Sequence, residues 1–86
     1  MVALDRLAIE MIRATALGGK IEKSGQALVL VRFRYPEDRV RVAIGSMGGY
    51  EWRPSLKMFA HEVTGAKVLL TYVSKTQSTM ATLLQP

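Results

Sequence analysis

Apolar residues recur at helical spacing in ALDRLAIEMIRATAL, residues 3–17 of the chain. Leu4, Leu7 and Met11 fall on one face of a helix with about 3.6 residues per turn, and charged residues cluster on the opposite face. A glycine pair follows at residues 18–19, and glycine adopts the left-handed conformation of a helix end without steric cost. The pattern predicts an amphipathic helix over residues 3–17.

Apolar and charged residues alternate strictly in VRFRYPEDRVRV, residues 31–42, on both sides of a Pro-Glu-Asp segment. A period of two is typical of a strand with one buried face, and Pro36 suits the first central position of a turn. The alternation predicts a hairpin formed by residues 27–35 and 39–45. One face of this hairpin would be apolar, formed by Val29, Val31, Phe33, Tyr35, Val40, Val42 and Ile44.

A glycine-rich loop, GSMGGYEWR, occupies residues 45–53, and Pro54 follows it. Proline is favoured in the first turn of a helix because its missing N–H has no helical partner there. Apolar residues then recur at helical spacing until Gly65. We therefore expect a second helix over residues 54–64, with an apolar stripe of Leu56, Phe59, Ala60 and Val63.

The remaining segments favour strands. Residues 66–73, AKVLLTYV, carry apolar side chains on both faces, which is typical of a central strand that is covered on both sides. Threonines favour a further strand over residues 79–84, with a short C-terminal helix as the alternative. The polar connector at residues 20–26 has room for a short strand around Ile21.

These elements predict an α+β fold in which two helices pack on one face of a small, mostly antiparallel sheet. The sheet would have three or four strands, in the order α-β-β-α-β(-β), and residues 1–86 would form one compact domain. The predicted core consists of Leu4, Leu7, Met11, Val29, Val31, Phe33, Val40, Val42, Ile44, Leu56, Phe59, Val63, Val68 and Leu70.

Composition adds an apolar surplus and a positive charge. Hydrophobic residues make up 49% of the 86-residue chain, so a second copy or another partner could bury part of them. The net charge of +5 favours anionic partners, such as nucleic acid or an acidic protein surface. The chain has no cysteine, no apolar run long enough for a membrane span and acidic residues early in the sequence, so we expect a cytoplasmic protein.

The predicted hairpin would bring four arginines onto one face. Arg34 would lie opposite Arg39, and Arg32 opposite Arg41, although opposed like charges destabilise a strand pair by roughly 0.2–1 kcal/mol. Arginine binds phosphate and carboxylate groups through a bidentate fork and stacks on bases. We therefore expect a small non-enzymatic binding module that holds an anionic partner, with nucleic acid favoured and Arg53 as a fifth cation.

Other interpretations of the arginines remain open. They could pair with an acidic neighbour, be solvated, or cover Leu28 and Leu30 with their alkyl stems. The acidic candidates are Glu37, Asp38, Glu22 and Glu51. If the helices cover only the other face, these leucines form an exposed apolar patch rimmed by arginine, a common composition of protein interfaces. The alternative function is a protein-interaction domain, such as a homodimeric adaptor or a small inhibitor.

Two aromatic residues of the glycine-rich loop are also candidate contact residues. Tyr50 and Trp52 could stack on bases or anchor a partner, although a lone tryptophan in a small domain more often covers the core. A glycine-rich segment before a helix can cradle phosphate, but GSMGG lacks the Lys-Ser/Thr of a Walker A loop. We therefore interpret this segment as a flexible connection.

Catalysis is not expected from the titratable residues. His61 is the only histidine, is predicted to face solvent, and has no cysteine beside it with which to bind a transition metal. The carboxylates lie on separate predicted elements, so no acid–base pair is indicated. We therefore expect no enzyme, no cofactor and no metal site. The enzymatic alternative would require residues from two chains to build a site at the glycine-rich loop.

Overall fold

The structure is a computed structural model that describes residues 3–85; Met1, Val2 and Pro86, which belong to the predicted domain, lie outside the described residues. This range contains two α-helices, α1 (Leu4–Thr15) and α2 (Glu37–Gly45), and a short 3-10 helix, η1 (Pro54–Leu56). The strands are β1 (Lys20–Ser24), β2 (Leu28–Phe33), β3 (Tyr50–Arg53), β4 (Met58–His61), β5 (Lys67–Val73) and β6 (Ser78–Leu84).

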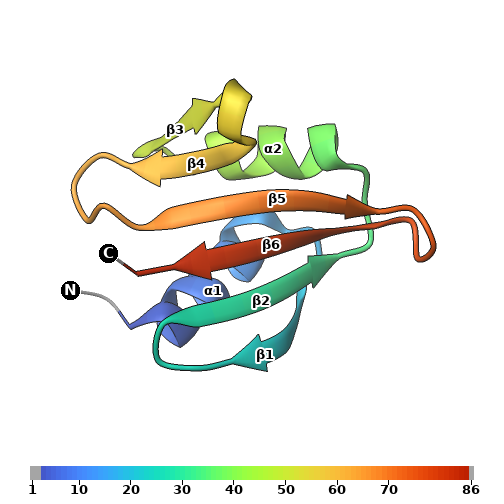
Figure 1. The fold of residues 1–86 in the computed structure, drawn as a ribbon, viewed down its shortest axis with the longest axis horizontal. Helices are drawn as coiled ribbons and strands as arrows, with labels where there is room; N and C mark the ends of the chain where they lie inside the picture. The colour runs from blue at the N-terminus through green and yellow to red at the C-terminus, as the bar shows by residue number, and fades with distance from the viewer. Residues whose placement is uncertain (1–2, 86) are drawn as a thin grey trace.

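The strands form one six-stranded antiparallel sheet in the order β1-β2-β6-β5-β4-β3. Both helices lie on the same face, behind the sheet in Figure 1, and no element of residues 3–85 covers the opposite face. Helix α1 packs against β1, β2 and β6, whereas α2 packs against β3, β5, β6 and α1. The predicted α+β class is confirmed, but the predicted number and order of the strands are wrong.

Strand β6 lies near the centre of the sheet, between β2 and β5. Ala81 faces Val31 of β2 on one side and Leu70 of β5 on the other. All three side chains point toward the helices and are buried. The last strand of the chain therefore joins the N-terminal hairpin of β1 and β2 to the strands that follow α2.

Residues 37–45 form helix α2 and not the second strand of the predicted hairpin. Pro36 precedes the helix in an extended conformation, and its carbonyl oxygen accepts the N–H of Val40 at 3.2 Å. Glu37 and Asp38 occupy the first turn, where the helix dipole favours acidic side chains. The Pro-Glu-Asp segment thus begins a helix, although it is also compatible with a turn.

The residues after Pro36 follow the period of a helix and not the strand period of two that the alternation predicts. Val40 and Ile44 are fully buried, and their spacing of four residues fits one face of a helix as well as one face of a strand. Val42, which the hairpin would bury with them, is 66% exposed. The helical period therefore separates residues that the strand period groups together.

Residues 54–64 do not form the predicted second helix. Pro54 begins only a 3-10 turn, which Lys57 ends in the left-handed conformation with a φ of 47°. The chain returns as β4 and pairs with β3, so that Trp52 lies opposite Phe59 with ring centroids 4.9 Å apart. Cross-strand aromatic pairs stabilise antiparallel strands, and here this pairing prevails over the helical spacing of the apolar residues.

Most of the predicted core is buried between the sheet and the helices. Buried as predicted are Leu4, Met11, Val29, Val31, Phe33, Val40, Ile44, Phe59, Val68 and Leu70. Leu7 is half-buried against this core, while Val42, Leu56 and Val63 are exposed because the elements assigned to them are absent. The core also contains Ala8, Ala81 and Leu83, which were not predicted.

The elements at the two ends of the chain are confirmed. Helix α1 lies within residues 3–17, and the strand expected around Ile21 is β1. The strand predicted over residues 66–73 is β5, and the last segment is the strand β6 and not the alternative helix. In each case the local pattern and the tertiary environment favour the same structure.

Gly19 allows the chain to pass close to Phe33. A Cβ atom at this position would lie 2.5 Å from Cε1 of the Phe33 ring, which is fully buried. We predict that Gly19→Ala lowers the free energy of unfolding by about 1–3 kcal/mol, as overpacking substitutions do, measured by urea denaturation. Gly25→Ala is the matched control, because its Cβ would make an ordinary contact at 3.5 Å. Equal stability of the two variants would contradict the prediction.

Candidate functional site

The structure separates the arginines that the predicted hairpin brought together. Arg32 lies on β2 and points to the uncovered face, whereas Arg39 and Arg41 are exposed on α2. Arg34 is exposed in the bend between β2 and α2, and Arg53 ends β3 at the far edge of the sheet. The opposed arginine pairs predicted from the sequence are therefore wrong.

The two arginines of the sheet form ion pairs within the chain. Nε of Arg32 lies 2.8 Å from Oε1 of Glu22 on the neighbouring strand β1, and because its N–H does not meet hydrogen-bond geometry the contact is an ion pair only. Nη2 of Arg53 lies 3.6 Å from Oε2 of Glu51 on the same strand. The positive charge of each of these two arginines is thus compensated by a glutamate nearby.

An apolar stripe crosses the uncovered face of the sheet over β2, β6, β5 and β4. Its members are the half-buried outward residues Leu28, Leu30, Met58, Leu69, Val73, Met80 and Leu84. Antiparallel sheets that face water on one side usually carry polar residues at the outward positions. An uncovered apolar stripe with polar residues around it is instead typical of an interaction surface.

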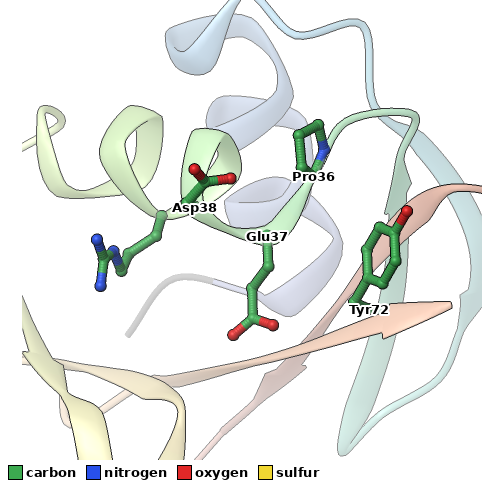
Figure 2. Close-up of a pocket in the computed structure, with 5 residues that line it drawn as sticks. Pro36, Glu37, Asp38 and Tyr72 are labelled. Carbon is green, nitrogen blue, oxygen red and sulfur yellow. The ribbon is translucent and has the colours of Figure 1, made fainter. Parts of the chain in front are cut away.

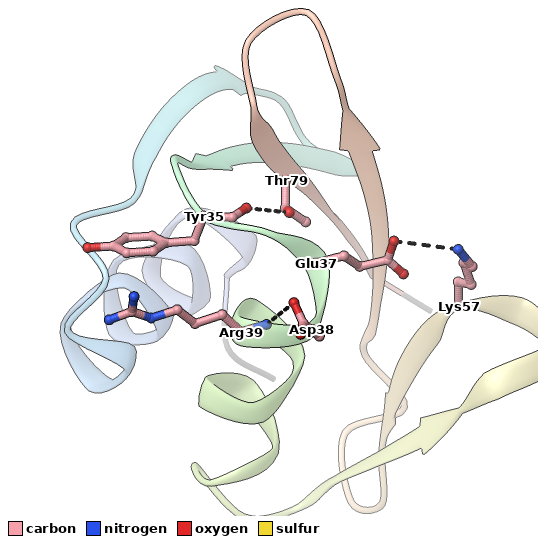
Figure 3. Close-up of polar contacts among 6 residues, drawn as sticks. All are labelled: Tyr35, Glu37, Asp38, Arg39, Lys57 and Thr79. Carbon is pink, nitrogen blue, oxygen red and sulfur yellow. Dashed lines mark hydrogen bonds and ion pairs between the residues drawn. The ribbon is translucent and has the colours of Figure 1, made fainter.

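On α2, two exposed arginines lie against aromatic rings. Cζ of Arg39 is 4.5 Å from the centroid of the Tyr35 ring (Figure 3), and Cζ of Arg41 is 5.6 Å from that of Trp52. Tyr35 is itself held by Thr79 of β6, whose hydroxyl donates a hydrogen bond of 2.7 Å to the Tyr35 carbonyl oxygen. The aromatic contacts orient both guanidinium groups while leaving them exposed.

An open pocket of about 370 Å³ lies at the start of α2 (Figure 2). Oε2 of Glu37 lies 3.5 Å from Nζ of Lys57, which directly precedes β4. The lining holds the carboxylates of Glu37 and Asp38 together with the guanidinium of Arg41, so it does not favour a ligand of one charge. The lining residues are Pro36, Glu37, Asp38, Arg41 and Tyr72.

His61 lies on strand β4, half-buried, so the predicted solvent-facing position on a helix is wrong. Its ring packs edge-on against Tyr50 across the strand pair, with centroids 4.8 Å apart. Nδ1 accepts hydrogen bonds from the N–H groups of Val63 and Thr64, both at 3.2 Å. In the neutral ring the proton is then on Nε2.

Trp52 is partly buried and packs against the hydrophobic core. This position agrees with the interpretation that a lone tryptophan covers the core of a small domain. Because its ring also contacts Arg41, the residue links the core to the exposed surface of α2.

A cavity of about 360 Å³ lies between α1 and the pair of strands β3 and β4, beside the glycine-rich loop. Its polar lining includes Glu10, Tyr50 and His61. Sequence reasoning missed this site because helical periodicity places Glu10 on the polar face of α1 and gives no indication of what lies across from it. Tyr50 was singled out, but as a surface contact.

Within residues 3–85, no three His, Cys, Asp or Glu side chains are grouped so that they could hold a metal ion. Neither α-helix in this range has the length and apolar character needed to cross a membrane.

Comparisons with models of known families, with curated proteins and with solved structures gave no match.

The environment of Tyr50 predicts a pH-dependent stability. Burial raises the pKa of its phenol above the ordinary value of 10.0, and the carboxylate of Glu10 adds to the shift. The neutral phenol therefore stabilises the folded state fully below pH 10.0, and this contribution is lost as the pH rises through the higher folded pKa. Urea denaturation over this alkaline range should show a loss of stability that Tyr50→Phe removes.

Tyr72→Phe is the matched control for this measurement, because it alters an exposed phenol on β5. The rest of the chain is identical in all three proteins, so its contribution cancels in the comparison. The same alkaline loss in Tyr50→Phe as in the wild type would contradict the prediction.

Proposed function

We propose that this protein is a protein-interaction module that self-associates through the uncovered face of its sheet. The apolar stripe would lie at the centre of a symmetric dimer. The observation that supports this proposal is the group of apolar outward residues on β2, β6 and β5, which is interrupted by Thr82 and Thr71. Leu28 and Leu30, expected from the sequence to contact a partner, both belong to the stripe.

Strand β5 gives the most direct argument for a second cover on the sheet. Its inward residues Val68 and Leu70 are buried beneath the helices. Its outward residues Leu69 and Val73 have no element above them within residues 3–85. Apolar residues on both faces are typical of strands covered on both sides. A second copy of the sheet would provide the missing layer, as in sandwiches whose sheets pack about 10 Å apart.

The charges on this face are compatible with a second copy. In a twofold interface the same patch occurs on both partners, so an uncompensated charge near the axis would meet its own copy. Arg32 and Arg53 are paired with glutamates of the same chain. Lys20 and Lys23 lie on the edge strand β1, and Lys67 lies at the start of β5, so that their long side chains can extend into solvent.

The size of the face is sufficient for a stable interface. The structure extends 34 × 25 × 22 Å along its principal axes, and Figure 1 views the sheet down the shortest of them. The face spanned by the two longer axes can supply the roughly 800 Å² per partner of a standard interface. A chain with an apolar layer on each side of one sheet also accounts for a hydrophobic content of 49%.

We predict that light scattering over a concentration series gives a mass that rises from 9.5 kDa toward twice that value. Leu30→Asp should raise the dimer dissociation constant more than about tenfold, because a charge would be buried in both halves of the interface and 1.4 kcal/mol already corresponds to tenfold. Leu69→Asp, on the other side of β6, should have the same effect.

Val42→Asp is the matched control, because it makes the same kind of change at an exposed valine on α2, away from the stripe. Circular dichroism of each variant would verify that the fold is retained. A wild-type protein that is monomeric at every concentration, or a dimer weakened equally by Val42→Asp, would refute the proposed interface.

A second candidate function is binding of nucleic acid through the exposed surface of α2. The contacts of Arg39 with Tyr35 and of Arg41 with Trp52 favour it, because they orient two exposed guanidinium groups. Arg34, in the bend between β2 and α2, adds a third exposed cation. Glu37 and Asp38 oppose this function, so it ranks below self-association.

If these three arginines each neutralise one phosphate of duplex DNA, the logarithm of the affinity should fall with the logarithm of salt concentration with a slope of about −2.7. Replacing Arg39 and Arg41 with alanine should reduce the magnitude of this slope by about 1.8, measured by fluorescence anisotropy. Arg53→Ala, which removes an arginine paired on the sheet, should leave it unchanged. A slope that does not depend on Arg39 and Arg41 would remove this candidate.

A further inference from the structure

The cavity beside the glycine-rich loop is separate from the proposed dimer interface. Leu4 and Leu7 of α1 form one wall, Met47 contributes from the loop, and Tyr50 and His61 line the side formed by β3 and β4. Tyr50 and His61 belong to the face of the sheet that carries the helices. The volume of about 360 Å³ falls within the range of small-molecule sites.

The aromatic side of the cavity is held in place by its neighbours. The ring of Tyr50 lies nearly perpendicular to the rings of His61 and of the core residue Phe59, with centroids 4.8 Å and 6.3 Å away. Gly49 has a φ of 78°, and a Cβ there would lie 2.7 Å from Nε2 of His61. The loop can therefore approach the His61 ring only because residue 49 is glycine.

One charged side chain lines this cavity among the described residues, the carboxylate of Glu10. Oε1 of Glu10 lies 3.5 Å from Nε of Arg6, but this pair is exposed, and Arg6 is not part of the lining. The phenol of Tyr50 is neutral at physiological pH, because the ordinary pKa of 10.0 is already far above it and burial and the Glu10 carboxylate raise the pKa further. The cavity thus combines apolar walls, an aromatic ring and one negative charge.

We infer that this cavity binds a small apolar molecule that carries an amine. The apolar part would lie between Leu4, Leu7 and Met47. The ammonium group would lie between the Glu10 carboxylate and the face of the Tyr50 ring, since cations are attracted to both. A carboxylate in the same position would be repelled by Glu10, so the site discriminates against acids of similar shape.

The probe for this proposal is 2-phenylethylamine, added to the full chain and followed by NMR of the backbone amides. Saturable shifts are expected at Gly48, Tyr50 and Thr64, which surround the cavity. The acid of similar shape, 3-phenylpropionate, should give no such shifts at the same concentrations. Salt at about 0.1 M keeps the net charge of +5 from dominating the comparison, because it screens charges beyond roughly 10 Å.

Glu10→Gln tests the role assigned to the carboxylate. Because Glu10 is exposed, this substitution should leave the fold intact. It should weaken binding of 2-phenylethylamine roughly five- to tenfold, because the charge-assisted contact becomes a neutral one. Binding of the uncharged analogue 2-phenylethanol should not change. Glu62→Gln, an exposed glutamate outside the cavity lining, is the matched control and should leave amine binding unchanged.

The proposal is overturned if the acid binds as well as the amine, if the shifts lie away from the cavity, or if Glu10→Gln has no effect. Binding by the Leu30→Asp variant, which carries its change on the other face of the sheet, should equal that of the wild type. The ligand site can therefore succeed or fail independently of the dimer.

Discussion

The pairing of β6 with β2 is the constraint on which the rest of the structure depends. It places Val31 opposite Ala81, across a long stretch of chain whose ordering costs conformational entropy. Burial offsets this cost, because the inward side chains of both strands, among them Val29 and Leu83, are fully enclosed beneath the helices. Without this pairing, the hairpin of β1 and β2 and the strands after α2 would have no common sheet.

The same pairing explains why the arginines are dispersed. With β1 on one side of β2 and β6 on the other, the segment after Pro36 has no free strand edge with which to form a hairpin. It becomes helix α2 and buries Val40 and Ile44 against the inner face of the sheet. Arg32 remains on the outer face, while Arg39 and Arg41 move to the opposite side of the molecule with the helix.

Sequence patterns predicted those elements whose local period has a single interpretation. Helix α1 and strand β5 belong to this group, and so does the α+β class, whereas for β6 the threonines decided between a strand and the alternative helix. Some errors occur where a pattern fits both a helical and a strand period, as the spacing of Val40 and Ile44 does. Others occur where a residue distant in sequence determines the secondary structure, as Trp52 does by pairing with Phe59. The cavity depends on the approach of α1 to β3 and β4, which no local pattern encodes.

The apolar stripe is not a by-product of building the core. Successive residues of a strand point to opposite faces, so outward positions can become polar without disturbing the inward ones. The sheet itself contains such positions: Thr82 lies outward on β6 between Leu30 and Leu69, and Thr71 lies outward on β5. Threonine in place of leucine or methionine at the neighbouring outward positions would therefore leave the packing beneath the helices unchanged. A layer on the outer side of the sheet, which residues 3–85 do not themselves supply, is the reason that we propose for their apolar character.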